Sequence, residues 1–182
     1  MPVTPGHDDA LKPSATVLLE RRFELADEAA TDAFGARFAH AIVATRAREP
    51  FAGLQVQLTG DLGAGKTSLV RATLRALGHA GRVRSPTYTL VEPYTVETTN
   101  GELQLYHFDL YRFSDPAEWA DAGFREYFDS GAVCLVEWPQ RAGALLGVPD
   151  LVLALEPGAR GEGRVLTAHA FSASGKACLE RC

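Results

Sequence analysis

The residues best suited to chemistry stand together in one glycine-rich stretch, Gly-Asp-Leu-Gly-Ala-Gly-Lys-Thr at positions 60–67. It fits the phosphate-binding P-loop pattern, a glycine, four residues and then Gly-Lys-Ser/Thr. Glycines let the backbone turn sharply and point consecutive N–H groups at an anion, and a following helix adds its own unpaired donors. Lys66 can reach the β- and γ-phosphates, and the Thr67 hydroxyl can ligate Mg²⁺. The stretch predicts a nucleotide phosphate site; the alternative is a strand-to-helix turn that binds nothing.

Two acidic residues at the ends of apolar strands compete for the metal-side role in such a site. Glu137 follows the apolar run 133–136, which is the usual layout of a Walker B acid. Its carboxylate is expected at the carboxyl edge of the sheet, beside the P-loop. A capping or ion-paired acid is the alternative for Glu137. Asp109 is the other candidate, and an acid in so apolar a strand needs a partner, which favours a functional role.

Period-2 counting places His107, Asp109 and Tyr111 on one face of their strand. His107 and Asp109 could therefore serve one site, or hydrogen-bond each other within the core. For His107 alone a structural role is favoured. Arg112 could pair with Asp109 or stabilise phosphate charge, and a surface ion pair is its simpler role.

Two further segments could serve the phosphate site. Ser85-Pro86-Thr87 lies in a loop whose hydroxyls could bind Mg²⁺ or sense the γ-phosphate, as switch loops do, or it could be a turn before a strand. Trp138, next to Glu137, could stack on a base or pack under the loop. From the residues alone packing is favoured for Trp138.

The P-loop requires a strand before it and a helix after it, and both patterns are present. Residues 54–59 alternate as a strand, although Gln55 and Gln57 make one face wetter than a strand buried on both sides requires. Residues 67–77 read as a helix that stops at Gly78. Its expected apolar face consists of Leu69, Val70, Thr73, Leu74 and Leu77.

The remaining patterns predict further strands and helices. Asp27 is the expected N-cap of a helix reaching about residue 46, which buries Phe34, Phe38, Ala41, Ile42 and Thr45. Asn100-Gly101 carries a hairpin signal, and Ser114-Asp115-Pro116 opens a helix. We expect strands at 16–25, 103–112, 132–138, 151–156 and 164–171, a loop that leads into a strand over 83–91, and short helical segments at 124–129 and 139–146.

These elements predict an α/β fold with a single P-loop NTPase-like domain. Its central sheet is expected to be mixed and mostly parallel, with antiparallel hairpins and helices on both faces. We expect a disordered N-terminal tail at 1–16, the domain at 17–172 and a frayed C-terminal end at 173–182.

Composition narrows the class of protein. The chain has 182 residues and a net charge of −5, which argues against a broad nucleic-acid surface. No apolar run approaches a membrane span, and the first residues lack the features of a secretion signal. The three cysteines have no metal-ligand spacing: Cys134 is expected in the core, Cys178 and Cys182 near a mobile end. A cytoplasmic location fits best.

The order of four motifs is more specific than any one of them. Gly-Asp-Leu-Gly-Ala-Gly-Lys-Thr, Ser-Pro-Thr-Tyr, His-Phe-Asp-Leu-Tyr-Arg and Glu-Trp-Pro together closely resemble the TsaE (YjeE) family over about residues 23–171. The resemblance implies a P-loop domain that hydrolyses ATP in support of tRNA modification. It implies TsaD and TsaB proteins as partners, with tRNA reached indirectly through the complex, and no membrane. The product is the threonylcarbamoyl group on the adenosine next to the anticodon. Gln140 and Tyr88 depart from the family's usual Glu and Phe.

Carried onto this sequence, the resemblance implies ATP and Mg²⁺ as cofactors. It makes Lys66, Asp109 and Thr87 the catalytic residues, with Thr87 in a switch-like loop, and Thr67 and Glu137 the metal ligands. The expected nucleotide-binding residues are Asp61, Leu62, Gly63, Ala64, Gly65, Lys66, Thr67, Ser68 and Trp138.

Two other functions remain open at this point. A small-molecule kinase shares the P-loop, although no clear arginine-rich lid follows the P-loop helix. A nucleotide-dependent binding module would bind ATP without turnover. A GTPase is disfavoured because the guanine-reading sequence Asn-Lys-x-Asp is absent.

Overall fold

The computed structural model describes residues 15–48 and 50–182. Most of the predicted tail, residues 1–14, lies outside the described residues. The strands and helices in chain order are β1 (Leu19–Leu25), α1 (Glu28–Arg48), β2 (Leu54–Thr59), α2 (Lys66–Ala76), β3 (Val91–Thr98), β4 (Gly101–Asp109), α3 (Pro116–Asp121), α4 (Arg125–Phe128), β5 (Val133–Glu137), β6 (Leu151–Pro157), β7 (Arg164–Ala170) and α5 (Ala173–Glu180).

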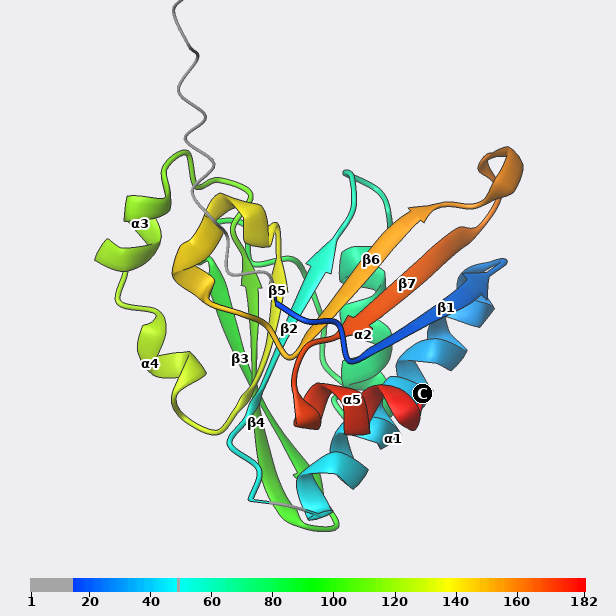
Figure 1. Cartoon of the computed structure of the whole chain (residues 1–182), viewed down its shortest axis with the longest axis horizontal. Coiled ribbons are helices and arrows are strands. Elements are labelled where there is room, and N and C mark those ends of the chain that lie inside the picture. The colour runs from blue at the N-terminus through cyan, green and yellow to red at the C-terminus, as the bar shows by residue number, and fades with distance from the viewer. Residues whose placement is uncertain (1–14, 49) are drawn as a thin grey trace, which may run out of the picture.

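The strands form one sheet in the order β1-β7-β6-β2-β5-β4-β3 (Figure 1). β2 pairs in parallel with β5 and β6, and β4 pairs in parallel with β5. The pairs β1–β7, β6–β7 and β3–β4 are antiparallel. Because β1 and β6 both oppose β7, five of the seven strands run in the same direction. The predicted mixed, mostly parallel sheet with two antiparallel hairpins is confirmed.

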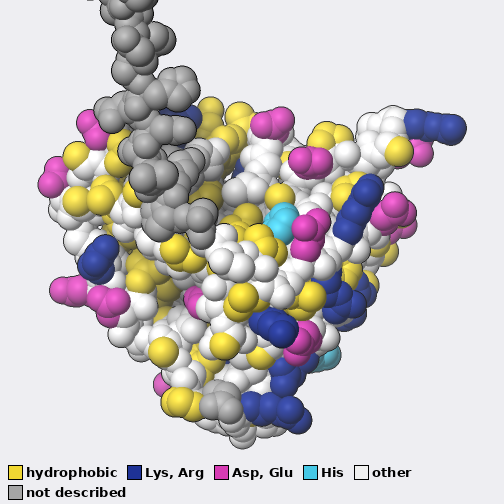
Figure 2. All heavy atoms as spheres, in the orientation of Figure 1, with side chains coloured by type: hydrophobic (Ala, Val, Ile, Leu, Met, Phe, Trp, Pro, Cys, Tyr) yellow, Lys and Arg dark blue, Asp and Glu magenta, His cyan; other side chains and the backbone are white. Residues whose placement is uncertain are grey.

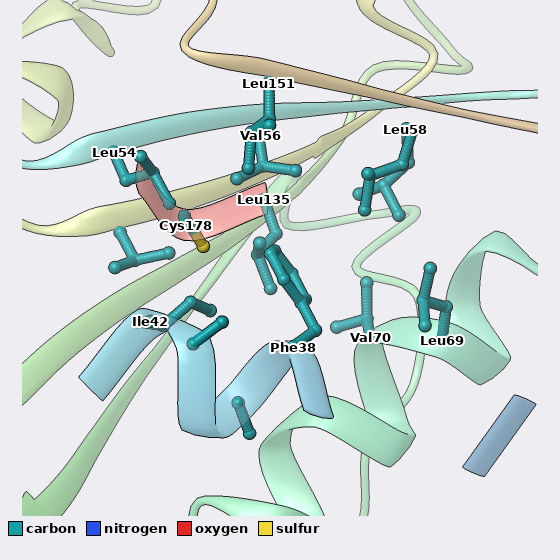
Figure 3. Close-up of a cluster of buried hydrophobic side chains, with 14 of the residues drawn as sticks. Phe38, Ile42, Leu54, Val56, Leu58, Leu69, Val70, Leu135, Leu151 and Cys178 are labelled. Atoms are coloured by element: carbon teal, nitrogen blue, oxygen red, sulfur yellow. The ribbon is translucent and has the colours of Figure 1, made fainter. Parts of the chain in front are cut away.

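Helices cover both faces of this sheet, as predicted. α1 and α2 pack together on one face, where their apolar side chains meet those of β2, β5 and β6. Figure 3 labels Phe38, Ile42, Leu69 and Val70 on the helices and Leu54, Val56, Leu58, Leu135 and Leu151 on the strands. The opposite face of β4 and β5 is covered by α3, α4 and the short 3-10 turns Pro139–Arg141 and Gly143–Leu146. Alternation along β5 divides the two cores, because Leu135 faces the first and Val136 the second.

Local signals position α1 and α2 as the sequence predicts. The Asp27 carboxylate accepts a hydrogen bond from the backbone N–H of Ala30 (2.8 Å), which caps α1. The predicted apolar faces of both helices are buried. Gly78 follows α2 with a φ of +100°, a conformation that glycine adopts without strain and that ends the helix.

The C-terminal end differs from the prediction of a frayed segment. Residues 173–180 form α5, whose Cys178 and Leu179 are buried in the same hydrophobic cluster as the apolar face of α1. Figure 3 shows Cys178 in this cluster. Ser172 caps the helix by accepting from the N–H of Gly175 (3.0 Å), and its hydroxyl donates to Asp150 (2.6 Å). A short, small-residue helix carries a weak periodic signal, so its docking depends on contacts that are distant in sequence.

The strand that carries Asp109 is shorter than predicted. β4 ends at Asp109, and the chain turns at Tyr111 and Arg112 instead of continuing as a strand. The N–H of Leu110 donates to the carbonyl of Glu137 (3.1 Å). In the β4–β5 register Asp109 lies directly opposite Glu137, so both acids emerge at the same edge of the sheet.

Charge is unevenly spread over the face seen in Figure 2. Acidic side chains are scattered across it, whereas Lys and Arg side chains gather toward the lower right, where α1 and α5 lie in Figure 1. Among residues 15–48 and 50–182, no helix combines the length and apolar character that crossing a bilayer requires.

Candidate nucleotide site

The loop between β2 and α2 has the geometry of a phosphate cradle. Gly63 and Gly65 have φ values of +78° and +101°, which favour glycine. A Cβ on Gly65 would overlap the guanidinium of Arg164, whereas a Cβ on Gly63 would meet nothing within 4 Å. Gly65 is therefore required both for backbone conformation and for a close approach. The loop opens at the N-terminus of α2, where unpaired backbone donors favour an anion.

The Lys66 side chain is held inside this loop. It is 5% exposed, and its ammonium donates to the carbonyl oxygens of Gly60 and Asp61, the latter at 3.1 Å. The Nζ atom also lies 4.0 Å from the centre of the Trp138 ring, a cation–π contact. Neutral oxygens and an aromatic face, rather than an ion pair, thus hold the charge beside the loop.

Burial and neighbouring acids act on Lys66 in opposite directions. Burial lowers the pKa of Lys66 below its usual value, and the negative charges of Glu137, Asp109 and Asp61 work against that shift. The site therefore places a desolvated ammonium next to acids. A bound polyanion would give that ammonium a stronger partner than the loop carbonyls.

Glu137 lies beside the P-loop, as its position at the end of β5 predicted. The Thr67 hydroxyl is 3.0 Å from each oxygen of the Glu137 carboxylate. On the other side, Nε2 of His107 is 2.5 Å from Oε2 of Glu137, and both residues are buried. Of the two roles left open for His107, the structure supports a buried contact, although its partner is Glu137 rather than Asp109.

Asp109 connects the end of β4 to the loop at 85–87. One carboxylate oxygen accepts from the Ser85 hydroxyl, and the other accepts from the backbone N–H of Tyr111 (3.0 Å). The N–H of Thr87 donates to the carbonyl of Ser85 (2.9 Å), so the loop turns tightly there. Asp109 is 6% exposed, and its charge is compensated by these donors. The position of the loop is thereby tied to the same carboxylate that faces the P-loop cleft.

Trp138 packs rather than standing free. Its backbone is left-handed, with a φ of +57°, and its ring centre lies 4.9 Å from that of Tyr111. A bulky residue in this conformation carries a cost, and such strain is concentrated at functional sites. Arg112 does not contact Asp109; its guanidinium lies 4.1 Å from the centre of the exposed Tyr88 ring.

The P-loop, the 85–87 loop, Asp109, Glu137 and Trp138 line one cleft of about 430 Å³. Every predicted site residue lines it except Asp61, whose side chain is exposed and whose carbonyl supports Lys66 instead. The lining also contains Arg164, the first residue of β7, which the sequence did not suggest. No local motif marks Arg164; only the sheet order brings it to the P-loop. The lining predicted from sequence is Leu62, Gly63, Ala64, Gly65, Lys66, Thr67, Ser68, Thr87, Asp109, Glu137 and Trp138.

The donor set fits a magnesium–nucleotide ligand. Mg²⁺ prefers hard oxygen ligands and is commonly bound by one or two protein groups together with substrate phosphates. The Thr67 hydroxyl and the Glu137 carboxylate converge in this way beside the loop. The left-handed glycines and the N-terminus of α2 fit the phosphates.

The fold and the P-loop between β2 and α2 define the class: this is a P-loop NTPase-like α/β domain. The family model described as "Threonylcarbamoyl adenosine biosynthesis protein TsaE" matches residues 25–164, and the chain belongs to that family. The resemblance found in the motifs is thereby confirmed.

Individual relatives agree with this assignment. The tRNA threonylcarbamoyladenosine biosynthesis protein TsaE of Haemophilus influenzae is 41% identical over 130 residues, covering 71% of this chain and 78% of that protein. The protein of the same name from Synechocystis sp. is 39% identical over 126 residues, covering 65% and 70%. The crystal structure of Bacillus subtilis YdiB superposes with a TM-score of 0.65 at 27% identity, covering 92% of this chain and 95% of that one.

Proposed function

We propose that this protein is an Mg²⁺-dependent ATPase that supports formation of the threonylcarbamoyl group on the adenosine next to the anticodon of tRNA. One observation carries the ATPase part: the P-loop hydroxyl of Thr67 meets the carboxylate of Glu137 at 3.0 Å, beside the ammonium of Lys66. Membership of the TsaE family supports the tRNA part. Its partners are TsaD and TsaB proteins, and it reaches tRNA through their complex in the cytoplasm.

The P-loop backbone and Lys66 bind the phosphates. N–H groups at the start of α2 donate to them, while the Lys66 ammonium exchanges the carbonyls of Gly60 and Asp61 for the β- and γ-phosphates. The nucleotide is ATP rather than GTP, because the chain has no Asn-Lys-x-Asp sequence to read guanine.

Thr67 and Glu137 are the residues that would hold Mg²⁺. When bound, Mg²⁺ neutralises phosphate charge and stabilises the charge that develops during phosphoryl transfer. The His107 ring, 2.5 Å from Glu137, fixes the orientation of that carboxylate from the buried side. Such a contact behind a metal ligand tunes both its position and its affinity.

Asp109 and Thr87 act at the γ-phosphate, where water attacks. Asp109 orients the attacking water, and its hydrogen bond from Ser85 makes the position of the 85–87 loop depend on the same carboxylate. A change at the γ-phosphate therefore alters that loop, and with it the surface around the exposed Tyr88 that a partner can contact. This coupling is the route by which hydrolysis reaches the partner proteins.

The ATPase proposal is tested with Glu137→Gln, which keeps the side-chain shape and removes the charge. We expect ATP turnover in the presence of Mg²⁺ to fall by about 10²-fold or more, because a metal ligand is worth several kcal/mol in the transition state. Phosphate release is measured with and without added TsaD and TsaB. Glu97→Gln, at an exposed position on β3, is the matched control and should turn over normally. Wild-type turnover by Glu137→Gln would contradict the assignment.

The tRNA part is tested separately in the host. Depletion of the protein should lower threonylcarbamoyladenosine in total tRNA, measured by mass spectrometry, and the wild-type gene should restore it while Glu137→Gln should not. Unchanged modification after depletion rejects the pathway assignment. Equal ATP turnover with and without the partners rejects the coupling.

A further inference from the structure

The side chain of Arg164 reaches the P-loop from β7, which lies two strands away from β2 in the sheet. Arg164 is the first residue of β7 and is paired with Leu25 on β1 and Pro157 on β6. Its guanidinium lies against Gly65, so closely that a Cβ there would overlap it. Two neighbouring strands thus hold the backbone of Arg164 while its charge is extended over the loop.

Arg164 also stands at the boundary of two clefts. It lines the P-loop cleft of about 430 Å³ and an adjoining cleft of about 390 Å³. The second cleft is formed by the start of α1, the P-loop residues Gly63 and Ala64, and the turn that ends at Gly163. A ligand that extended from one cleft into the other would pass the guanidinium.

The charge of Arg164 is available for such a ligand. Among residues 15–48 and 50–182, no carboxylate lies within ion-pair distance of its guanidinium. A half-buried guanidinium presents a planar set of donors that matches phosphate oxygens in a bidentate way. Lys66, by contrast, carries its charge on a single ammonium group that lacks this planar set of donors.

The sheet order indicates which end of the phosphate chain Arg164 meets. Glu137 and Asp109 stand at the ends of β5 and β4, on one side of the P-loop strand β2. Arg164 comes from β7, beyond β6, on the other side. The metal and the hydrolytic groups mark the γ-phosphate end, so Arg164 faces the end that leads toward the nucleoside.

We propose that Arg164 is a second cationic ligand of the bound nucleotide, contacting the phosphate nearest the nucleoside, with the nucleoside continuing into the adjoining cleft. The proposal rests on the nucleotide-binding part of the proposed function. It assigns to β7 a binding role that no P-loop motif contains.

The test measures binding of Mg-ATP and Mg-ADP to the full chain by isothermal titration calorimetry. Arg164→Gln keeps much of the length and removes the charge, and it should raise the Kd for both nucleotides by about 10- to 100-fold, the effect of one charge-assisted hydrogen-bonding group. Arg164→Lys restores a charge without the planar fork, so its Kd should fall between those of the wild type and Arg164→Gln. Arg160→Gln, an exposed arginine on the same turn, should bind as the wild type does.

The outcomes separate this proposal from the one it rests on. Nucleotide binding by the wild type together with unchanged binding by Arg164→Gln overturns the role of Arg164 alone. A loss confined to ATP places Arg164 at the γ-phosphate and overturns the proposed location. An Arg164→Lys variant no better than Arg164→Gln overturns the contact through charge. No nucleotide binding by the wild type rejects the proposed function itself. Thermal unfolding of each variant identifies any loss that comes from misfolding.

Discussion

Two features of the structure disfavour a side chain at Gly65, and their energetic costs can be measured separately by substitution. Its φ of +101° disfavours any side chain, and a Cβ there would also displace the guanidinium of Arg164. Gly63, two residues earlier, shares the positive φ at +78° but has open space around its Cβ position. Alanine at Gly63 therefore measures backbone strain alone, whereas alanine at Gly65 adds the displacement of Arg164.

The magnitudes follow from these two terms. A left-handed backbone costs an L-residue about 1–2 kcal/mol, so Gly63→Ala should lower Tm by about 2–8 °C at this chain length. Gly65→Ala pays the same strain and must also push aside a flexible side chain. We place that second term at about 1 kcal/mol, the low end of overpacking, or a further 2–4 °C.

The assay is thermal unfolding without nucleotide, followed by circular dichroism, for each alanine variant in the wild-type and Arg164→Ala backgrounds. Removing Arg164 should abolish the extra cost of Gly65→Ala and leave the cost of Gly63→Ala unchanged, because only the first pair is in contact. The reasoning is refuted if Gly65→Ala costs no more than Gly63→Ala, or if its extra cost persists without Arg164.

The cysteines and Trp138 give further tests. The native chain should show one fast-reacting thiol at pH 8, that of Cys182, because Cys134 and Cys178 are buried; a second fast thiol in a chromogenic titration would contradict the docking of α5. Burial raises the pKa of Cys134 to about 12, so the unfolded chain ionises first, and the free energy of unfolding should fall between about pH 9 and pH 12 more steeply than in Cys134→Val. In a Trp119→Phe protein, saturating Mg-ATP should change the emission of Trp138, because the Lys66 ammonium 4.0 Å from its ring is drawn to phosphate. An unchanged spectrum while calorimetry detects binding would show that Lys66 does not move.

Local patterns were sufficient to predict the elements that carry the P-loop. The strand at 54–59 matches β2 to the residue, and both ends of α2 lie within one residue of the predicted helix at 67–77. The Asp27 cap and the Asn100-Gly101 hairpin were equally readable, because capping and turn chemistry act within a few residues. The end of β4 was not predicted. After Asp109 the N–H of Tyr111 donates to the Asp109 carboxylate and the N–H of Phe113 donates to the carbonyl of Leu110, which turns the chain out of the strand that the alternating pattern predicts.

In the candidate site, too, some features follow from local patterns and others depend on how distant strands pair. Glu137 was predicted beside the P-loop because a strand end after an apolar run is a local feature with a known place in parallel sheets. The contact between His107 and Glu137 depends on the register of β4 against β5, which period-2 counting within one strand does not contain. Counting placed His107 on the correct face and left its partner open.

Arg164 is the extreme case, and the sheet order explains why. Groups that follow β2 directly, or that end the strands on its β5 side, carry P-loop and Walker-type patterns that can be read from the sequence. The other side of β2 is built by β6 and β7, an antiparallel hairpin whose turn aims the first residue of β7 at Gly65. An arginine after a glycine-rich turn has no distinctive pattern of its own, so only the pairing of β6 with β2 gives it a ligand to meet. If Arg164 binds phosphate, the half of the site that holds Thr67, Asp109 and Glu137 is encoded by motifs, and part of the half that binds the nucleotide is encoded by topology. Substitutions in the hairpin should then weaken nucleotide binding more than they slow turnover at saturation.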